Sequence, residues 1–328
     1  MSTAIMCTDL SGEDALQLLE LESPPLGPDE VRIAIRAASV NFPDVLRIRG
    51  LYQSRVEPPF VPGSECAGEV IEVGSHVKDF VVGDRVLAVV GSGAFATEAI
   101  ASPRLHQVSR VPEIMPFEEA ASFAITYGTA LHGLARRAQL QSGETVLITG
   151  ASGGCGSAAI QVSKAMGANV IAVAGGDKKC GLATSLGADH VIDHRHLGSL
   201  SEAVGDLTNG WGVDVLFDTV GGSDAREQLR SLALYGRYLV VGFASGEIPS
   251  IRTNQTILKS ISVVGVAYGT SVSADPVANH EDSRRLFEWY REGQVRPWIG
   301  HRFALADAAN AMRFVSERRA LGKVVIVM

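Results

Sequence analysis

The sequence predicts an α/β protein with two domains, one with a doubly wound parallel sheet and one that is mostly antiparallel and barrel-like. From Thr145 to Phe243, short apolar strands alternate with helical segments, which is the pattern of a doubly wound sheet. Before residue 115, short strands are separated by glycine turns and proline clusters, which is typical of a small β-barrel. A chain of 328 residues is long enough for two such domains.

The β-rich part contains four strand candidates. They lie at residues 31–36, 68–73, 85–90 and 95–100. The first alternates apolar and polar side chains, as a half-buried strand does. A helix is predicted over 116–138, because Pro116 suits the first helical turn and the acidic Glu118 and Glu119 complement the helix dipole.

The alternating part predicts five strands and four helices, followed by a further strand at 257–266. The strands are expected at 145–149, 169–173, 190–193, 213–218 and 238–243, and the helices at 155–166, 178–186, 200–207 and 224–233. Two polar surface helices, at 281–292 and 307–317, and a terminal strand at 323–328 complete the chain. This order indicates that the chain returns to its first domain at the end.

Charge and composition exclude several classes of function. The net charge of −7 argues against general nucleic-acid binding, which depends on basic surface. The four cysteines, Cys7, Cys66, Cys155 and Cys180, form no C-x2-C pair, so neither a disulfide framework nor a cysteine-based zinc site is predicted. No secretory signal and no membrane span are expected, and free thiols suit the cytoplasm.

Glycine makes up 35 of the 328 residues, and one group of glycines has a specific pattern. The strand at 145–149 is followed by Gly150-Ala151-Ser152-Gly153-Gly154-Cys155-Gly156, where a helix opens. Aligned on Ala151, Gly153 and Gly156, this loop is a variant of the dinucleotide-binding fingerprint, which needs a tight turn, close approach of the pyrophosphate and close helix packing. The first N–H groups of the helix would bind the phosphates.

The same residues fit a second class of site. Gly150 to Gly154 also matches G-x-S-x-G, the nucleophile elbow of serine hydrolases, and Asp218 and either His280 or His301 follow in the right order. The elbow gives no reason for the glycine run to continue to Gly156, so dinucleotide binding is the favoured interpretation.

The second strand of the alternating part predicts NADPH rather than NADH. NAD sites usually have Asp or Glu at the end of this strand, but here Val173 is followed by Ala174-Gly175-Gly176. Lys178 and Lys179 then stand in the first turn of a helix, where a cation is unfavourable unless it binds a phosphate. The alternatives are a solvated helix end, and Asp177 as a displaced ribose ligand that would favour NADH.

Several motifs resemble the zinc-free quinone oxidoreductases of the medium-chain dehydrogenase/reductase superfamily. They are Asn41-Phe42-Pro43-Asp44-Val45-Leu46, Gly50-Leu51-Tyr52, the stretches 62–70 and 81–86, and Ala320-Leu321-Gly322-Lys323-Val324-Val325 near the end of the chain. The resemblance covers essentially the whole chain. It implies a GroES-like substrate domain over 1–122, a Rossmann NADP-binding domain over 123–264, and a return to the substrate domain over 265–328.

The sequence departs from the zinc alcohol dehydrogenases of the same superfamily. Ser64 stands where their G-H-E motif has a zinc-binding histidine, their first catalytic-zinc cysteine is replaced near Asn41, and their four-cysteine lobe is missing. Because a catalytic zinc needs three protein ligands, no metal site is expected there. One other group of residues could suggest a metal site: His190, His194 and His196, with Asp189 and Asp193. The favoured interpretation is that these residues belong to a loop near the adenosine of the cofactor.

The resemblance also implies roles for individual residues. Asn41, Tyr52 and Tyr127 would form the catalytic group: Asn41 would contact the nicotinamide or hold the acceptor oxygen, Tyr52 would line the acceptor pocket, and a tyrosine or water would donate the proton. The cofactor-binding residues would be Asn41, Thr126, Ala151, Ser152, Gly153, Gly154, Cys155, Gly156, Gly175, Lys178, Lys179, His194, Gly242, Phe243, Ala244 and Arg318. Lys179 and Arg318 would hold the 2′-phosphate, and residues 242–244 would border the nicotinamide. The simpler alternatives are a turn-forming Asn41 and a packing role for Tyr52.

The expected function is hydride transfer from NADPH to a flat electrophile such as a quinone. The first alternative is reduction of α,β-unsaturated carbonyls or enoyl-CoA thioesters, for which Arg47, Arg49 and Arg55 could supply basic surface. The alternative of another class is an NADPH-binding protein without turnover. Relatives commonly dimerise through the strand at 260–266, so a homodimer is expected, and an apolar edge strand gives this a physical reason.

Overall fold

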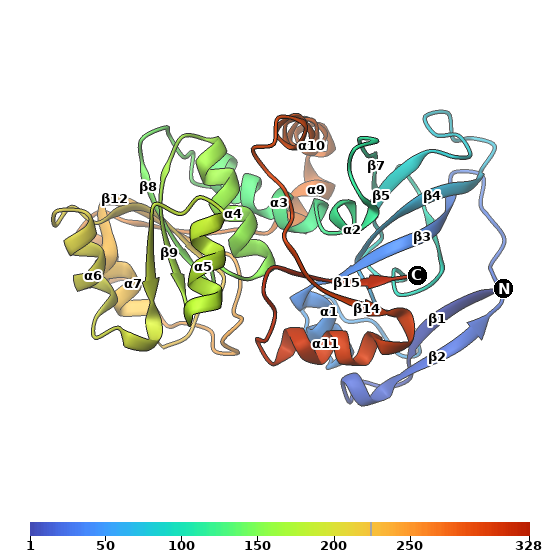
Figure 1. Ribbon diagram of the computed structural model, residues 1–328, viewed down its shortest axis with the longest axis horizontal. Helices are drawn as coiled ribbons and strands as arrows, with labels where there is room; N and C mark the ends of the chain where they lie inside the picture. The colour runs from blue at the N-terminus through green and yellow to red at the C-terminus, as the bar shows by residue number, and fades with distance from the viewer. Residues whose placement is uncertain (224) are drawn as a thin grey trace. The chain divides into compact units, whose positions relative to one another are not determined.

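The computed structural model describes residues 1–223 and 225–328, which form two compact units of mixed α/β structure (Figure 1). Unit 1 comprises Met1–Ile125 and Pro297–Met328, and unit 2 comprises Thr126–Arg296. The predicted fold class is confirmed, with a barrel-type unit and a doubly wound unit. The sequence placed the return to the first domain at residue 265, whereas residues 265–296 belong to unit 2 in the structure.

Unit 2 is built on a six-stranded parallel sheet in the order β10-β9-β8-β11-β12-β13. The strands are β8 (Thr145–Thr149), β9 (Asn169–Ala174), β10 (His190–Asp193), β11 (Val213–Asp218), β12 (Leu232–Val240) and β13 (Ser262–Gly265). Figure 1 shows α4 (Gly154–Ala165) and α5 (Asp177–Ser185) on one side of this sheet, and α6 (Leu200–Leu207) and α7 (Ala225–Ser231) on the other. The strand order reverses between β8 and β11, and ligands of such sheets bind beyond the carboxyl ends of the strands at this point.

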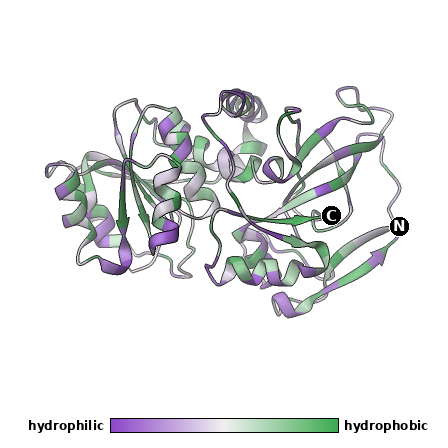
Figure 2. Cartoon of the chain, viewed as in Figure 1, coloured by the Kyte–Doolittle hydropathy of each residue, from purple (hydrophilic) through white to green (hydrophobic). Residues whose placement is uncertain are grey.

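The central strands are apolar throughout because both faces of the sheet are covered by helices. Val146, Leu147 and Ile148 of β8 are fully buried, as are Leu216 and Phe217 of β11. In Figure 2 the strands of this sheet are predominantly green, whereas purple segments occur on the helices. The continuous apolar runs seen in the sequence are therefore these buried strands.

Some boundaries in unit 2 differ from the sequence prediction. The strand expected at 257–266 is a short helix, α8 (Asn254–Ile257), followed by β13, with a left-handed Ser260 between them at φ 49°. β12 begins at Leu232, so the helix expected over 224–233 ends earlier, and its expected first residue, Asp224, lies outside the described residues. Two further helices complete the unit: α9 (Tyr268–Ala274) and α10 (Pro276–Arg291).

The helix expected over 116–138 is divided into three segments. They are α2 (Phe117–Ala120), α3 (Ala124–Leu131) and a π-helical segment at His132–Arg137. The boundary between the two units falls within α3, between Ile125 and Thr126.

Unit 1 is built on a seven-stranded sheet in the order β14-β15-β3-β4-β5-β7, with β6 also paired to β3, and on a separate β1-β2 hairpin. The strands are β1 (Ser2–Cys7), β2 (Leu16–Leu21), β3 (Val31–Val40), β4 (Glu65–Val73), β5 (Arg85–Val89), β6 (Glu98–Ala101), β7 (Gln107–Arg110), β14 (Ile299–Ala304) and β15 (Lys323–Val327). Two helices matter below: α1 (Phe42–Ile48) and α11 (Ala308–Ser316). The antiparallel pairing of β15 with β3 sets Val324 opposite Val40, which brings the end of the chain to Asn41.

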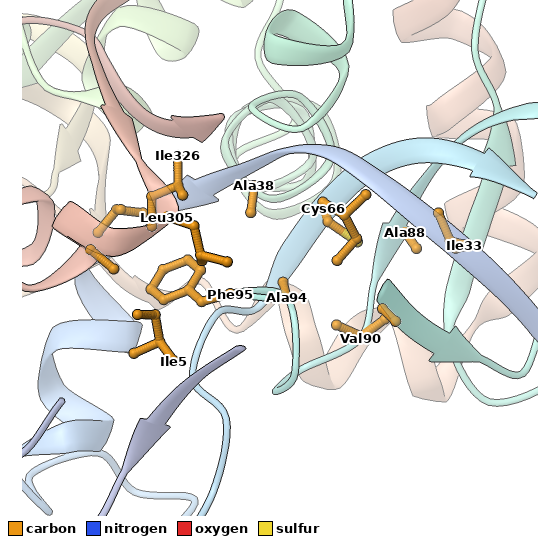
Figure 3. Close-up of a cluster of buried hydrophobic side chains, with 14 of the residues drawn as sticks. Ile5, Ile33, Ala38, Cys66, Ala88, Val90, Ala94, Phe95, Leu305 and Ile326 are labelled. Carbon is orange, nitrogen blue, oxygen red and sulfur yellow. The ribbon is translucent and has the colours of Figure 1, made fainter. Parts of the chain in front are cut away.

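The core of unit 1 joins both ends of the chain. Figure 3 shows Phe95 close to Ile5, Leu305 and Ile326, which come from β1, the turn before α11, and β15. Phe95 is fully buried, and the cluster continues along β3 and β4 through Ile33. The last residues of the chain are therefore part of the core of this unit. Among the described residues, no helix is long and apolar enough to cross a membrane.

Candidate functional site

The glycine loop of unit 2 turns sharply from β8 into α4. Gly150 has φ +62°, a backbone conformation that favours glycine, and Gly153 is the N-cap of α4. A Cβ on Gly156 would lie 2.2 Å from the carbonyl oxygen of Gly150, so only glycine allows the helix to pack this closely on the strand. The loop is held to the second strand by the N–H of Ala151, which donates to the carbonyl of Val173 at 3.1 Å.

The first turn of α4 has the features of an anion-binding site. N–H groups at the start of a helix have no partners inside the helix, and among the described residues no side chain caps this one at Gly153. Ala151 and Ser152 are buried, whereas Gly154 and Cys155 are partly exposed. The expected pyrophosphate-binding residues therefore lie together at the carboxyl end of β8.

Asp218, at the end of β11, forms hydrogen bonds with several neighbouring segments at this edge of the sheet. Its carboxylate accepts hydrogen bonds from the Tyr238 hydroxyl at 2.6 Å and from the Thr149 hydroxyl and the backbone N–H of Gly221. Burial and the charge of Asp218 both raise the pKa of Tyr238 well above its usual range. Among the described residues of this unit, no histidine forms a hydrogen bond or an ion pair with this carboxylate.

The segment expected at the nicotinamide lies at the same edge. Gly242 donates its N–H to the carbonyl of Asp218 at 3.2 Å, and Ala244 donates to the carbonyl of Thr219 at 3.1 Å. A Cβ on Gly150 would lie 2.4 Å from Oγ1 of Thr219, so residues 242–244 and the glycine loop both contact the turn after β11. The structure thus brings these two expected cofactor segments to the point where the strand order reverses.

Basic side chains surround the loop after β9. A Cβ on Gly175 would lie 2.5 Å from Nε2 of His194, and a Cβ on Gly176 would lie 2.8 Å from Nη1 of Arg195. Arg195 is ion-paired with Asp193 at 2.8 Å, and this contact holds the pKa of Asp193 far below its usual range. Sequence reasoning did not single out Arg195, although its place two residues after the third strand of the sheet was a usable signal.

Three further basic residues that were expected to bind the cofactor lie in two different units. Lys178 and Lys179 lie in the first turn of α5, next to Gly176. Arg318 lies in unit 1, in the turn after α11, with a left-handed φ of 59°.

Tyr127 and Thr126 are buried residues of α3. The hydroxyl of Tyr127 accepts a hydrogen bond from Nε2 of Gln161 on α4, at 2.9 Å, and the side chain is only 1% exposed. This contact gives Tyr127 a packing role against α4. The expected role of Tyr127 as a proton donor stays a prediction.

Unit 1 contains a buried polar cluster that sequence reasoning identified only in part. Its members are Ser39, Asn41, Asp44, Arg47, Ser64, Glu65 and Lys323. Oε1 of Glu65 accepts from Ser39 at 2.8 Å, from Nδ2 of Asn41 at 3.0 Å and from Nζ of Lys323 at 3.3 Å. Nζ of Lys323 also donates to Oδ1 of Asn41 at 2.7 Å. Both ends of the Asn41 amide are therefore bound within this unit.

The other half of the cluster surrounds Asp44 on α1. Its carboxylate accepts from the N–H of Asn41 at 2.9 Å and from the hydroxyl of Ser64. Nη1 of Arg47 donates to Oγ of Ser64 at 2.6 Å. Burial raises the pKa of Asp44 to about 6, although the bonds from Ser64 and Asn41 and the charge of Arg47 oppose this rise. The cluster contains two carboxylates and two cations.

Tyr52 lies beside this cluster. The guanidinium of Arg47 stands over its ring, 4.8 Å from the centroid, and both side chains line a cavity of about 320 Å³. The role of Tyr52 at an acceptor pocket stays a prediction. Among the described residues, no group of three His, Cys, Asp or Glu side chains is arranged to hold a metal ion.

Family models, related sequences and solved structures all show similarity to dehydrogenases and reductases. The family model for the alcohol dehydrogenase GroES-like domain matches residues 27–113, and that for zinc-binding dehydrogenases matches residues 154–288. Quinone oxidoreductase-like protein 2 of Bos taurus is 39% identical over 325 residues, which are 98% of this chain and 91% of the relative. The crystal structure of Escherichia coli quinone oxidoreductase complexed with NADPH matches with a TM-score of 0.91 at 27% identity, over 99% of this chain and 100% of that chain. CurK enoyl reductase matches with a TM-score of 0.88 at 28% identity, over 100% of this chain and 99% of that chain.

Proposed function

Since this chain belongs to the quinone oxidoreductase family of the medium-chain dehydrogenase/reductase superfamily, we propose that it is a zinc-free reductase that uses NADPH to reduce quinones. The observation that carries the proposal is the uncapped glycine loop at the point where the strand order of the parallel sheet reverses. An NADP-dependent oxidoreductase activity follows from the family. The quinone substrate, the absence of zinc and the preference for NADPH are proposals.

The chemistry of the buried polar cluster does not fit a catalytic zinc. Ser64 stands in place of a histidine, and a cysteine is replaced near Asn41; histidine and cysteine are the ligands that zinc prefers. The Ser64 hydroxyl is bonded to Asp44 and Arg47, and the Asn41 amide is bonded to Glu65 and Lys323. Two cationic side chains among these groups disfavour a divalent cation, so we propose a reaction without a Lewis acid.

The roles of this chain's residues then follow from their positions. The glycine loop would bind the pyrophosphate, and residues 242–244 would border the nicotinamide. When bound, NADPH supplies the hydride. Tyr52 lines the cavity of unit 1, which we propose as the acceptor site, and Tyr52 is the proposed proton donor, with water as the alternative. Asn41 is proposed to hold the buried polar cluster in place rather than to contact the acceptor directly.

A substrate panel tests the proposed function. We expect the purified protein to oxidise NADPH with menadione. Reduction of crotonaldehyde or crotonyl-CoA in preference to menadione would favour the second candidate, an enoyl reductase, for which the similarity to CurK enoyl reductase is the specific observation. Tight NADPH binding with no turnover of any acceptor would instead indicate a cofactor-binding protein without catalysis.

The preference for NADPH should depend on the basic residues around Gly175 and Gly176. Replacing Lys179 with Gln is expected to lower the NADPH-to-NADH ratio of kcat/KM by on the order of tenfold, because a charge-assisted hydrogen bond to the 2′-phosphate is lost. Arg195→Gln is expected to act in the same direction. Lys164→Gln is the matched control, since Lys164 pairs with Asp189 on the surface of the same unit. An unchanged ratio in both test variants would refute this 2′-phosphate site.

We also propose a homodimer formed through β13, which is the last strand in the order of its sheet. Val263 is 43% exposed on this strand, and an unpaired apolar edge is a hazard unless another chain covers it. Sedimentation should therefore give twice the 34.7 kDa chain mass. Val263→Lys should shift the protein towards monomer, whereas Val277→Lys on α10 should not. A wild-type monomer would contradict the proposal.

We also propose that the protein is cytoplasmic, since its four cysteines are free thiols, which suit a reducing compartment.

A further inference from the structure

Three arginines line the cavity next to Tyr52 in unit 1. Arg47, Arg49 and Arg55 come from one short stretch of chain, and Glu57 is the one acidic side chain in the lining. The volume of about 320 Å³ is at the lower end of the range for small-molecule sites. This concentration of positive charge is unusual in a chain whose net charge is −7.

The three guanidinium groups are held to different degrees. Nη1 of Arg47 donates to Ser64 and to the carbonyl of Gly91 and lies 3.7 Å from the Asp44 carboxylate, whereas Nη2 makes no hydrogen bond with any described residue. Arg49 is ion-paired with Glu13 at 2.7 Å through Nε and Nη2. Arg55 is exposed and makes no hydrogen bond or ion pair with any described residue. Glu57, although it lines the same cavity, is not within ion-pair distance of Arg55 in the described part of the chain.

We propose that this cavity binds an anionic group of the electron acceptor, so that the preferred substrate is a conjugated carbonyl compound or quinone that bears a carboxylate or phosphate. This inference rests on the proposed reductase function and adds the charge of its substrate. Guanidinium groups bind both anions through paired N–H donors. The Tyr52 ring, held by Arg47, offers a flat apolar surface for the conjugated part of the acceptor.

The anion has two possible sources, a substituent on the acceptor itself or the phosphates of a carrier. Matched acceptor pairs separate them. The first pair is acetylacrylate and its methyl ester, and the second is crotonyl-CoA and the crotonyl thioester of N-acetylcysteamine. For each pair, kcat/KM of the anionic acceptor is divided by kcat/KM of the neutral acceptor, in wild type and in Arg55→Gln. Comparing this ratio between the two proteins cancels the difference in intrinsic reactivity between the two acceptors.

We expect this ratio to fall by on the order of tenfold in Arg55→Gln for at least one pair, because a charge-assisted contact to the anion is lost. The affected pair identifies the source of the anion. The wild-type ratio should also fall with added salt. Arg36→Gln, which removes a surface arginine paired with Glu69, is the control and should leave the ratio unchanged.

The outcomes separate this inference from the proposed function. If wild type reduces menadione or the neutral acceptors, but neither ratio changes in Arg55→Gln, the inference is wrong and the reductase function stands. If NADPH is oxidised with none of these acceptors, the proposed function fails and the inference fails with it. Because the Arg55 side chain has no partner among the described residues, loss of folding should not complicate the variant.

Discussion

Replacing Gly156 with alanine is expected to weaken NADPH binding by on the order of 100-fold or more. The new Cβ would lie 2.2 Å from the carbonyl oxygen of Gly150, which is a backbone atom and cannot rotate away. The start of α4 must therefore move away from β8, and its N–H groups move with it. Fluorescence titration with NADPH measures the change.

A control variant and a second test variant accompany this substitution. Gly205→Ala lies within α6, where a Cβ meets no atom within 4 Å, so NADPH affinity should be unchanged and the helix slightly stabilised. Gly153→Ala brings a Cβ only to 3.3 Å from Gly150, so the protein should fold normally while the pyrophosphate is obstructed. Wild-type affinity in both Gly156→Ala and Gly153→Ala would show that the cofactor does not bind at this loop.

Replacing Lys323 with methionine is expected to destabilise unit 1 by about 3–5 kcal/mol, because it leaves a buried carboxylate without its cation. The side chains of Lys323 and Glu65 are 4% and 1% exposed, so water cannot compensate. The melting temperature of the unit should fall by on the order of 10 °C. Differential scanning calorimetry of the full chain measures this.

A second substitution separates charge from packing. In Lys323→Met with Glu65→Gln, no charge is left unpaired at this site, so we expect part of the lost stability to return. Lys164→Met is the exposed counterpart, since its ion pair with Asp189 is one-third exposed and should be worth at most about 1 kcal/mol. If Lys323→Met melts like wild type, the buried ion pair does not stabilise the unit.

The sequence was sufficient to predict the parallel sheet and the glycine loop. Both depend on local patterns: buried strands are continuously apolar, and a tight strand-to-helix turn needs glycine within a few residues. The strands β8, β10 and β11 and the helix α6 have the predicted bounds.

The buried polar cluster could not be predicted as a whole, because it depends on pairing between distant segments. Lys323 reaches Asn41 through the register of β15 against β3, and 282 residues separate the two in the chain. A lysine in an otherwise apolar terminal strand was the available signal. The hydrogen bond from Gln161 to the Tyr127 hydroxyl was unpredictable for a related reason, since it depends on the packing of α3 on α4.

Strands with weak alternation were also missed. β1, β2, β7 and β14 have no clear sequence pattern, and β2 and β14 are mostly exposed or half-buried. Their positions follow from pairing with other strands rather than from their own residues. The end of unit 2 at Arg296 was misplaced for the same reason, since α9 and α10 resemble surface helices of either unit.

NADPH oxidation by metal-depleted protein is the most direct test of a zinc-free NADPH-dependent reductase. The protein is treated with a chelator, its metal content is measured by mass spectrometry, and its rate with menadione is compared with that of untreated protein. We predict the same rate in both samples, with metal far below one atom per chain. A rate that is lost on chelation and restored by zinc, or no oxidation in either sample, would contradict the account.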